Sequence, residues 1–212
     1  MLGTDSFQET DVIGITQPVT KWSYQIRRAE DVPWAVARAF YIASTGRPGP
    51  VVLDFAKDAQ TALLDWKYEK CRYIRSYHPY PAPDPDDLAS VAAMIDASSR
   101  PMILAGHGVM ISGAEKELAA LAEKAGIPVA ATLLGLSSIP SDHPLYKGML
   151  GMHGNIGPNV NTNRADLLIA VGMRFDDRVT GDVAHYAPEA RIVHIDIDAS
   201  EFGKNVHTDA TI

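Results

Sequence analysis

Two glycine-rich segments could hold a ligand, and each follows a strand that the sequence predicts. Gly106-His-Gly108 precedes a predicted helix start, where small residues let backbone N–H groups approach phosphate oxygens. Three glycines lie within Gly148-Met-Leu-Gly-Met-His-Gly154, and so permissive a backbone can lie along a planar ligand. Glycine-rich turns and a lone histidine such as His153 are also common as purely structural features, so neither segment identifies a ligand by itself.

Charged residues follow two later predicted strands. Gly172-Met-Arg-Phe-Asp-Asp-Arg178 holds two arginines that could bind phosphates and two carboxylates that could orient them or accept ribose hydroxyls. His194-Ile-Asp-Ile-Asp198 places Asp196 where dinucleotide-binding folds hold an adenosine ribose. Surface salt bridges would explain the arginines and carboxylates of the Gly172–Arg178 segment about equally well. The four segments together favour an extended dinucleotide more strongly than any one of them does.

Motifs for several other chemistries are missing from the sequence. It has no GxSxG, HExxH or P-loop lysine motif and no cluster of Cys and His, so hydrolase, zinc and kinase functions have no support. The pairs Asp176/Asp177 and Asp196/Asp198 are interpreted as structural. Neighbours in sequence do not converge as catalytic carboxylates from separate loops do.

Alternating strands and helices must position these segments. Strands are predicted over 51–56, 101–105, 128–133, 167–171 and 191–197, and short extended pieces over 12–16 and 21–24. A helix from Asp31 to Gly46 would bury Val32, Ala35, Val36, Ala39, Phe40 and Ala43, and a second helix would bury Leu88, Val91, Ala92 and Ile95. Ser112 and Glu115 read as a capping box. This alternation predicts an α/β fold with a doubly wound parallel sheet, in which ligands bind beyond the carboxyl ends of the strands.

Composition excludes several classes of protein. The chain has 212 residues, 46% hydrophobic and 21% charged, and a net charge of −7, so nucleic acid and anionic membranes are poor partners. Cys71 is the only cysteine, which rules out an intrachain disulfide and suits a reducing cytoplasm. Residues 1–20 lack the layout of a signal peptide, and the apolar runs are too short to cross a bilayer. We therefore expect a folded cytoplasmic protein.

Several strings of residues resemble the catalytic subunit of the acetolactate synthase (acetohydroxyacid synthase) family, nearly from end to end. They are Gly3-Thr-Asp-Ser-Phe-Gln-Glu9, Thr20-Lys21, Gly46-Arg-Pro-Gly-Pro50, Lys57-Asp58, Leu150-Gly-Met-His-Gly154 and Gly172-Met-Arg-Phe-Asp-Asp-Arg-Val-Thr-Gly181. The resemblance implies an enzyme that uses thiamine diphosphate, Mg²⁺ and FAD. Such an enzyme decarboxylates pyruvate and joins the two-carbon unit to pyruvate or 2-oxobutyrate, in branched-chain amino-acid biosynthesis.

The resemblance also implies a domain organisation. Residues 1–62 resemble the C-terminal part of the pyrimidine-binding domain, and residues 84–212 resemble the central FAD-binding domain, truncated at its C-terminal end. Between them, mixed aromatic and basic residues followed by the prolines of Tyr80-Pro-Ala-Pro-Asp-Pro85 indicate a linker, taken as 63–83. The chain is therefore expected to be a fragment that is inactive alone, without the glutamate that activates thiamine and without the Mg²⁺ motif. Homo-oligomers formed through the pyrimidine domain and a regulatory subunit are the partners that the family implies.

Site residues follow from the resemblance position by position. No catalytic residue or metal ligand is assigned; Phe7, Gln8 and Lys57 resemble residues near the substrate entrance. His107 stands where the family usually has a glycine, and its side chain could clash with the cofactor or form a hydrogen bond to it. The residues matched to the FAD site are Arg47, Gly106, His107, Gly108, Thr132, Leu133, Leu150, Gly151, Met152, His153, Gly172, Met173, Arg174, Phe175, Asp176, Arg178, Asp196 and Ile197.

Two other readings stay open. The chain could belong to another thiamine-dependent enzyme, of the glyoxylate carboligase or pyruvate oxidase type, although the Gly172–Gly181 string favours the synthase. It could also be a non-catalytic nucleotide-binding module built on the same fold.

Overall fold

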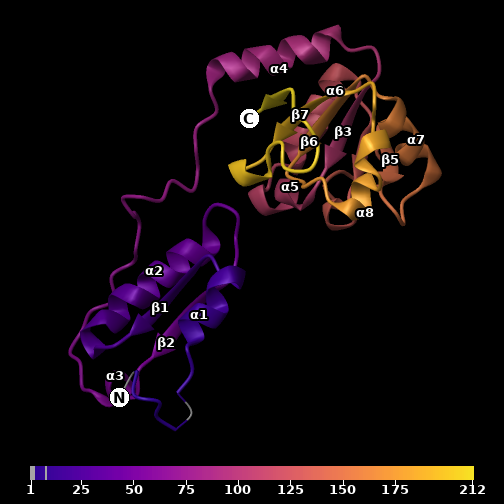
Figure 1. Ribbon diagram of the computed structural model, residues 1–212. Coiled ribbons are helices and arrows are strands. Elements are labelled where there is room, and N and C mark those ends of the chain that lie inside the picture. Colours follow the sequence, from indigo (N-terminus) through magenta and orange to yellow (C-terminus); the bar gives the residue numbers. More distant parts are fainter. Residues whose placement is uncertain (1–2, 8) are drawn as a thin grey trace. The chain divides into compact units, whose positions relative to one another are not determined.

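The computed structural model describes residues 3–7 and 9–212 and divides into two compact units (Figure 1). The first unit extends to Pro81 and the second runs from Ala82 to Ile212. The division falls inside the segment 63–83 that the sequence analysis interprets as a linker. Within the described residues no helix combines the length and the apolar character needed to span a bilayer.

The first unit is a small parallel α/β element. Strand β1 (Trp22–Ile26) pairs in parallel with β2 (Val51–Phe55), and helix α2 (Val32–Ser44) connects them and packs on both. Ile26, Ala35 and Ala59 form its buried core. Shorter elements are the helices α1 (Val12–Thr16) and α3 (Lys57–Thr61) and the 3₁₀ turns η1 (Gln17–Val19) and η2 (Ala29–Asp31).

Two predictions for the first unit are wrong in detail. Residues 12–16 form a helix and not an extended piece, because the Asp11 carboxylate accepts a hydrogen bond from the Gly14 N–H (3.0 Å) and caps the turn. Helix α2 exists as predicted, but Ala37 and Ile42 are buried in it while the Phe40 side chain is 70% exposed. Phe40 instead borders a cavity of about 520 Å³ shared with Tyr68 and Cys71.

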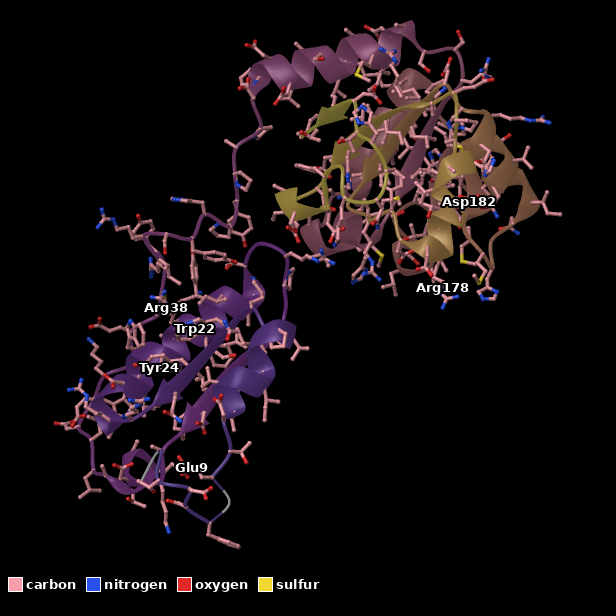
Figure 2. All side chains as sticks on the ribbon, viewed as in Figure 1. Glu9, Trp22, Tyr24, Arg38, Arg178 and Asp182 are labelled. Carbon is pink, nitrogen blue, oxygen red and sulfur yellow. The ribbon has the colours of Figure 1, made fainter. Side chains whose placement is uncertain are left out.

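Aromatic rings and a guanidinium group gather on the first unit. The ring of Trp22 stacks on that of Tyr24, with centroids 5.4 Å apart, and Trp34 meets both rings edge-on. The Arg38 guanidinium lies over the Trp22 and Trp34 rings at 5.4 and 5.3 Å (Figure 2). Cation–π attraction thus holds one side of α2 to β1.

The second unit contains a sheet of six parallel strands in the order β5-β4-β3-β6-β7-β8 (Figure 1). Counted in chain order within this unit, the arrangement is 3-2-1-4-5-6, that of a doubly wound dinucleotide-binding fold. The predicted fold class is confirmed. The strands are β3 (Pro101–Ala105), β4 (Val129–Ala131), β5 (Tyr146–Met149), β6 (Leu167–Val171), β7 (Arg191–Ile195) and β8 (Ala210–Thr211).

Alternate strand residues fill two separate cores, one on each face of the sheet. Ile103 and Ile169 belong to a cluster with residues of α4 (Pro85–Ala97), α5 (His107–Ser112) and α6 (Glu115–Ala125). Leu104 and Leu168 belong to the opposite cluster, with the segments that follow α7 (Ile156–Arg164) and β6. The remaining elements are α8 (Asp177–Thr180), η3 (Leu133–Gly135), η4 (Val183–His185) and η5 (Ala199–Glu201).

Several boundaries in the second unit differ from the prediction. Strands β5 and β8 were not predicted, β4 ends at Ala131 because Leu133–Gly135 turns into a 3₁₀ helix, and β7 ends at Ile195. The capping box is wrong: Ser112 is the last residue of α5 and its hydroxyl donates back to the Gly108 carbonyl (2.8 Å). On α4, Val91 is buried with Met94 and Ile95 against it, whereas Ala92 is exposed.

Candidate functional site

The loops that follow β3, β4, β5, β6 and β7 all leave the same end of the parallel sheet, here called the carboxyl end. Backbone hydrogen bonds join them in sequence across the sheet: Leu150 N–H to Ala131 (3.0 Å), Thr132 N–H to Ala105 (2.9 Å) and Gly172 N–H to Ile195 (2.8 Å). The strand order reverses between β3 and β6, which makes this the switch point at which such folds bind ligands. The structure therefore brings the segments that carry His153, Arg174 and Asp196 to one end of the sheet.

Gly106 and Gly108 serve close packing at the switch point. A Cβ on Gly106 would lie 2.3 Å from the Gly172 oxygen, and one on Gly108 would lie 2.6 Å from the Gly172 Cα. Their N–H groups donate to Val171 and Gly172 (both 2.9 Å). Both N–H groups are therefore already engaged within the protein and are not available to bind phosphate. His107 between them is exposed and donates from Nδ1 to the Leu134 carbonyl (3.0 Å).

The loop after β4 presents apolar side chains. The Thr132 hydroxyl accepts a hydrogen bond from the Gly135 N–H (3.1 Å) and shapes the turn. Leu133 and Leu134 are 68% and 67% exposed, an unusual state for two adjacent leucines. They form an apolar surface at the carboxyl end.

The loop after β5 is held against the segment after β6. Gly151 has a φ of +99°, and a Cβ there would meet the Arg178 carbonyl oxygen at 2.8 Å, so only glycine fits. The Met152 N–H donates to the same Arg178 carbonyl (2.7 Å). The Asn159 side chain accepts a hydrogen bond from the Gly151 N–H and donates one to the Gly151 carbonyl. Leu150 is buried, while Met152 and His153 are exposed.

The segment after β6 alternates buried and exposed side chains. Met173 and Phe175 are buried and anchor it, so that Arg174 faces solvent. The Arg174 guanidinium lies 3.2 Å from Asp176 Oδ2, while the buried Asp176 Oδ1 has no hydrogen-bond partner among the described residues.

Arg178 and Asp196 complete the charged groups of this end. Arg178 lies at the surface of the second unit, where its Nε is 3.9 Å from Asp177 and its Nη1 is 3.6 Å from the Met152 sulfur (Figure 2). The Asp196 carboxylate accepts a hydrogen bond from the Asp198 N–H (2.9 Å), and the neighbouring Ile197 is 43% exposed.

His194 is a supporting residue that the sequence analysis did not single out. It is fully buried in β7, between the rings of Phe175 and Phe202 at 5.3 and 5.2 Å, and its Nε2 donates to the Met173 carbonyl (2.7 Å). Asn205 similarly donates to the Phe175 carbonyl (2.6 Å). A histidine in an apolar strand was the only signal for this role, and it does not distinguish support from simple burial.

The site residues that were predicted in the first unit are distant in sequence from those at the carboxyl end of the second sheet. Phe7 is 92% exposed, Lys57 is an exposed first residue of α3, and Arg47 is exposed in the turn before β2; Gln8 lies outside the described residues. Their assignment to a substrate entrance or to the cofactor stays a prediction. Among the described residues no three His, Cys, Asp or Glu side chains gather as a metal site.

The carboxyl end thus offers two guanidinium groups, a buried carboxylate oxygen that has no partner among the described residues, and exposed apolar side chains. Arginine forks bind phosphate oxygens, a carboxylate oxygen accepts hydroxyl hydrogens, and leucine and methionine side chains cover planar rings. This combination suits a ligand with phosphate, polyol and aromatic parts.

Comparisons with known proteins agree with this fold. Residues 88–212 match the family model described as the central domain of thiamine pyrophosphate enzymes. The whole chain is 48% identical to a probable acetolactate synthase large subunit of Methanocaldococcus jannaschii, of which it covers 36%. It is 46% identical to the acetolactate synthase large subunit of Corynebacterium glutamicum over 96% of this chain and 33% of that one. The corresponding Lactococcus lactis protein is 43% identical over the full chain, with 37% covered. The chain thus spans about a third of the length of these relatives.

Proposed function

The chain belongs to the thiamine pyrophosphate enzymes, whose central domain it contains, and from this premise we propose that residues 84–212 bind FAD in an acetolactate synthase. The identity of 42–48% to acetolactate synthase large subunits along the chain supports the choice of enzyme within the family. The proposed activity belongs to the whole enzyme: it condenses pyruvate with a second 2-oxo acid, pyruvate or 2-oxobutyrate, with loss of CO₂. The contribution proposed for these residues is cofactor binding.

The described residues fit FAD at the carboxyl end of the second sheet. The observation that carries the proposal is the Arg174–Asp176 pair, in which one carboxylate oxygen is engaged and the other is buried with no partner in the part of the chain that the structure describes. A buried acceptor left unpaired costs about 1–3 kcal/mol, so a ligand hydroxyl placed there would recover that energy. Arg174 and Arg178 would hold the diphosphate, and Leu133, Met152 and Ile197 would cover the rings.

Gly106 and Gly108 in the loop after β3 would contribute shape and not hydrogen bonds. The N–H groups of Gly106 and Gly108 are engaged with Val171 and Gly172, so the diphosphate would depend on the two arginines. His107, which stands where the family usually has glycine, already donates to Leu134 and therefore turns toward the loop after β4.

Catalysis in the proposed enzyme would depend on cofactors held largely elsewhere. Thiamine diphosphate with Mg²⁺ supplies the electron sink for decarboxylation when bound, and the flavin supplies no net redox step in the synthase reaction. In the first unit, Phe7, Gln8 and Lys57 would lie near the substrate, where the lysine ammonium attracts the carboxylate of a 2-oxo acid. A homo-oligomer, a regulatory subunit and a cytoplasmic location belong to the same proposal.

Flavin fluorescence tests the cofactor assignment. Titration of FAD with the purified chain should give saturable quenching, and Arg174→Ala should weaken binding by about tenfold or more, because a charge-assisted contact to phosphate is lost. Arg191→Ala is the matched control, since Arg191 is exposed at the amino end of β7, at the opposite end of the sheet. Equal losses in both variants, or a preference for NAD over FAD, would contradict the assignment.

The activity is tested separately with the full-length gene product. Supplied with thiamine diphosphate, Mg²⁺ and FAD, it should convert pyruvate to acetolactate faster than it consumes glyoxylate. Preferential use of glyoxylate would instead support a glyoxylate carboligase, and bound FAD without either activity would support a non-catalytic nucleotide-binding module.

A further inference from the structure

A second cavity lies at the outer side of the sheet in the second unit. It has a volume of about 460 Å³ and is bordered by the segment 136–141, by Glu115 at the start of α6 and by Tyr146 at the start of β5. β5 is the terminal strand of the sheet, so the cavity opens beside it. Its volume falls in the range of about 300–1,000 Å³ that small-molecule sites occupy. None of the residues that border it belongs to the candidate FAD site.

The polar side chains that border this cavity lack partners among the described residues. Ser138 is fully buried and its Oγ has no hydrogen-bond partner in the described part of the chain. The side chains of Ser137, Ser141, Tyr146 and Glu115 likewise make no hydrogen bond or ion pair with the residues that the structure describes. Ser137 and Ser141 are exposed and Tyr146 and Glu115 are half-buried, so the buried group is Ser138 alone. Buried hydroxyls are nearly always paired, so the unpaired Ser138 Oγ at a cavity that other polar groups also border indicates that something else pairs it.

The charge of the cavity selects the class of ligand. Glu115 is the one bordering side chain that is charged at neutral pH, and its carboxylate outweighs the partial positive charge of the α6 N-terminus beside it. An ammonium group needs three acceptors, which a carboxylate and serine oxygens provide together. The remaining border is apolar, from Leu136, Ile139 and Pro140, with the Tyr146 ring.

We propose that this cavity binds a small primary amine whose ammonium group pairs with Glu115 and the serine hydroxyls and whose apolar body packs on Ile139, Pro140 and Tyr146. The backbone at Ser137 is consistent with a formed site, because its φ of +76° is uncommon outside glycine and persists only where the surroundings hold it.

Calorimetric titration of the chain with 2-phenylethylamine, and with uncharged 2-phenylethanol as the matched probe, tests the proposal. The amine should bind saturably and at least about tenfold more tightly than the alcohol at an ionic strength of about 0.15 M, because only the amine pairs with the carboxylate. Amide chemical-shift changes should centre on residues 136–141 and Tyr146. Equal affinity for the two probes, no saturable binding of either, or shifts centred elsewhere would overturn it.

Three variants separate the cavity from general surface charge. Glu115→Gln should weaken amine binding by about tenfold, and Ser138→Ala by a smaller factor without loss of folding, because it removes an unpaired buried hydroxyl. Glu117→Gln is the matched control, because Glu117 lies in the same first turn of α6 but does not border the cavity. A loss in Glu117→Gln as large as that in Glu115→Gln would show non-specific attraction and overturn the proposal. None of these variants touches the arginines on which FAD binding is proposed to depend, so the two proposals fail independently.

Discussion

His194 Nε2 lies 2.7 Å from the carbonyl oxygen of Met173, and this contact ties β7 to the loop that carries Arg174. The carbonyl can only accept, so the imidazole donates from Nε2 and the buried Nδ1 is left without a partner in the described part of the chain. The rings of Phe175 and Phe202 enclose the histidine from two sides. The buried His194 side chain of β7 therefore helps to hold the loop that carries Arg174 in position.

The first prediction concerns this histidine. His194→Ala should lower the stability of the second unit by about 2–4 kcal/mol, because it leaves a cavity between two rings and an unpaired Met173 carbonyl. Amide hydrogen exchange in β6 and β7 would measure the loss. Tryptophan fluorescence would not, because Trp22, Trp34 and Trp66 all lie in the first unit.

His185→Ala is the control for that experiment. The His185 side chain is 84% exposed and pairs with Asp182, three residues earlier in the chain. Such surface pairs contribute little to stability, so a loss below about 0.5 kcal/mol is expected. A comparable loss in the two histidine variants would refute the supporting role of His194.

The second prediction concerns the glycines at the switch point. Gly108→Ala should destabilise the second unit by about 2 kcal/mol or more, because its Cβ would lie 2.6 Å from the backbone of Gly172, which cannot move like a flexible side chain. Gly157→Ala, in α7, meets nothing within 4 Å and should be neutral or slightly stabilising. Exchange rates of the β3 and β6 amides would distinguish the two variants.

Much of the fold follows from local sequence patterns. The β-branched apolar runs at 51–55, 101–105 and 167–171 are strands as predicted, and their alternation with helices predicts the parallel doubly wound sheet. The apolar run and its flanking turns suffice for 101–105 and 167–171 because nearly all residues of these two strands are buried. The residues of 51–55 are only partly buried, and there the β-branched residues after a turn carry the prediction. Short strands such as Ala210–Thr211 carry no such pattern, since pairing with β7 and not composition makes them extended.

The sequence predicts which loops form the candidate site, but it does not predict the contacts between those loops. Parallel strands bring the segments with His153, Arg174 and Asp196 to one end, which the strand order alone implies. The sequence could not show that the Gly106 and Gly108 amides donate to Val171 and Gly172, because that depends on the close approach of two loops about 65 residues apart in the chain. The support from His194 has the same origin, and so does the buried oxygen of Asp176.

The third prediction concerns pH and Asp166, which precedes β6. Partial burial raises the pKa of its carboxyl group, but hydrogen bonds from the Ser98 hydroxyl and the Ser99 and Arg100 N–H groups outweigh this and hold the pKa at about 2. The lowered pKa means that the stabilisation is complete above the unfolded value near 3.8 and is lost as the pH falls through about 2. With allowance for solvent screening, its size is about 1 kcal/mol.

Asp166→Asn tests this linkage. The variant should be about 1 kcal/mol less stable than the parent at pH 7 and should lose less stability between pH 4 and 2, as measured by hydrogen exchange or urea unfolding of the second unit. Asp142→Asn is the control, since Asp142 is exposed and makes no side-chain hydrogen bond with the described residues. If the parent and Asp166→Asn lost the same stability over this pH range, the carboxylate would not be the linked group.

The last prediction concerns Lys21, which closes the C-terminal end of α2. Its ammonium donates to the carbonyls of Ile42 (2.5 Å) and Thr45 (2.7 Å) and to the Tyr77 hydroxyl (3.0 Å), and it lies 5.4 Å from the centre of the Tyr77 ring. Lys21→Met keeps the length of the side chain but leaves these helix carbonyls without their donor. A cation near a helix C-terminus contributes about 0.3–1 kcal/mol and each charged hydrogen bond more, so a loss of about 1–3 kcal/mol is expected in the first unit.

Tryptophan fluorescence during denaturant unfolding follows the first unit alone. The control is Lys57→Met, at an exposed position of α3, which should leave the midpoint of unfolding unchanged. If Lys21→Met and Lys57→Met unfolded at the same denaturant concentration, the ammonium contacts would contribute nothing, and segment 74–77 would have to be held to α2 by the Tyr77 hydroxyl and the Thr45 carbonyl (2.8 Å) instead.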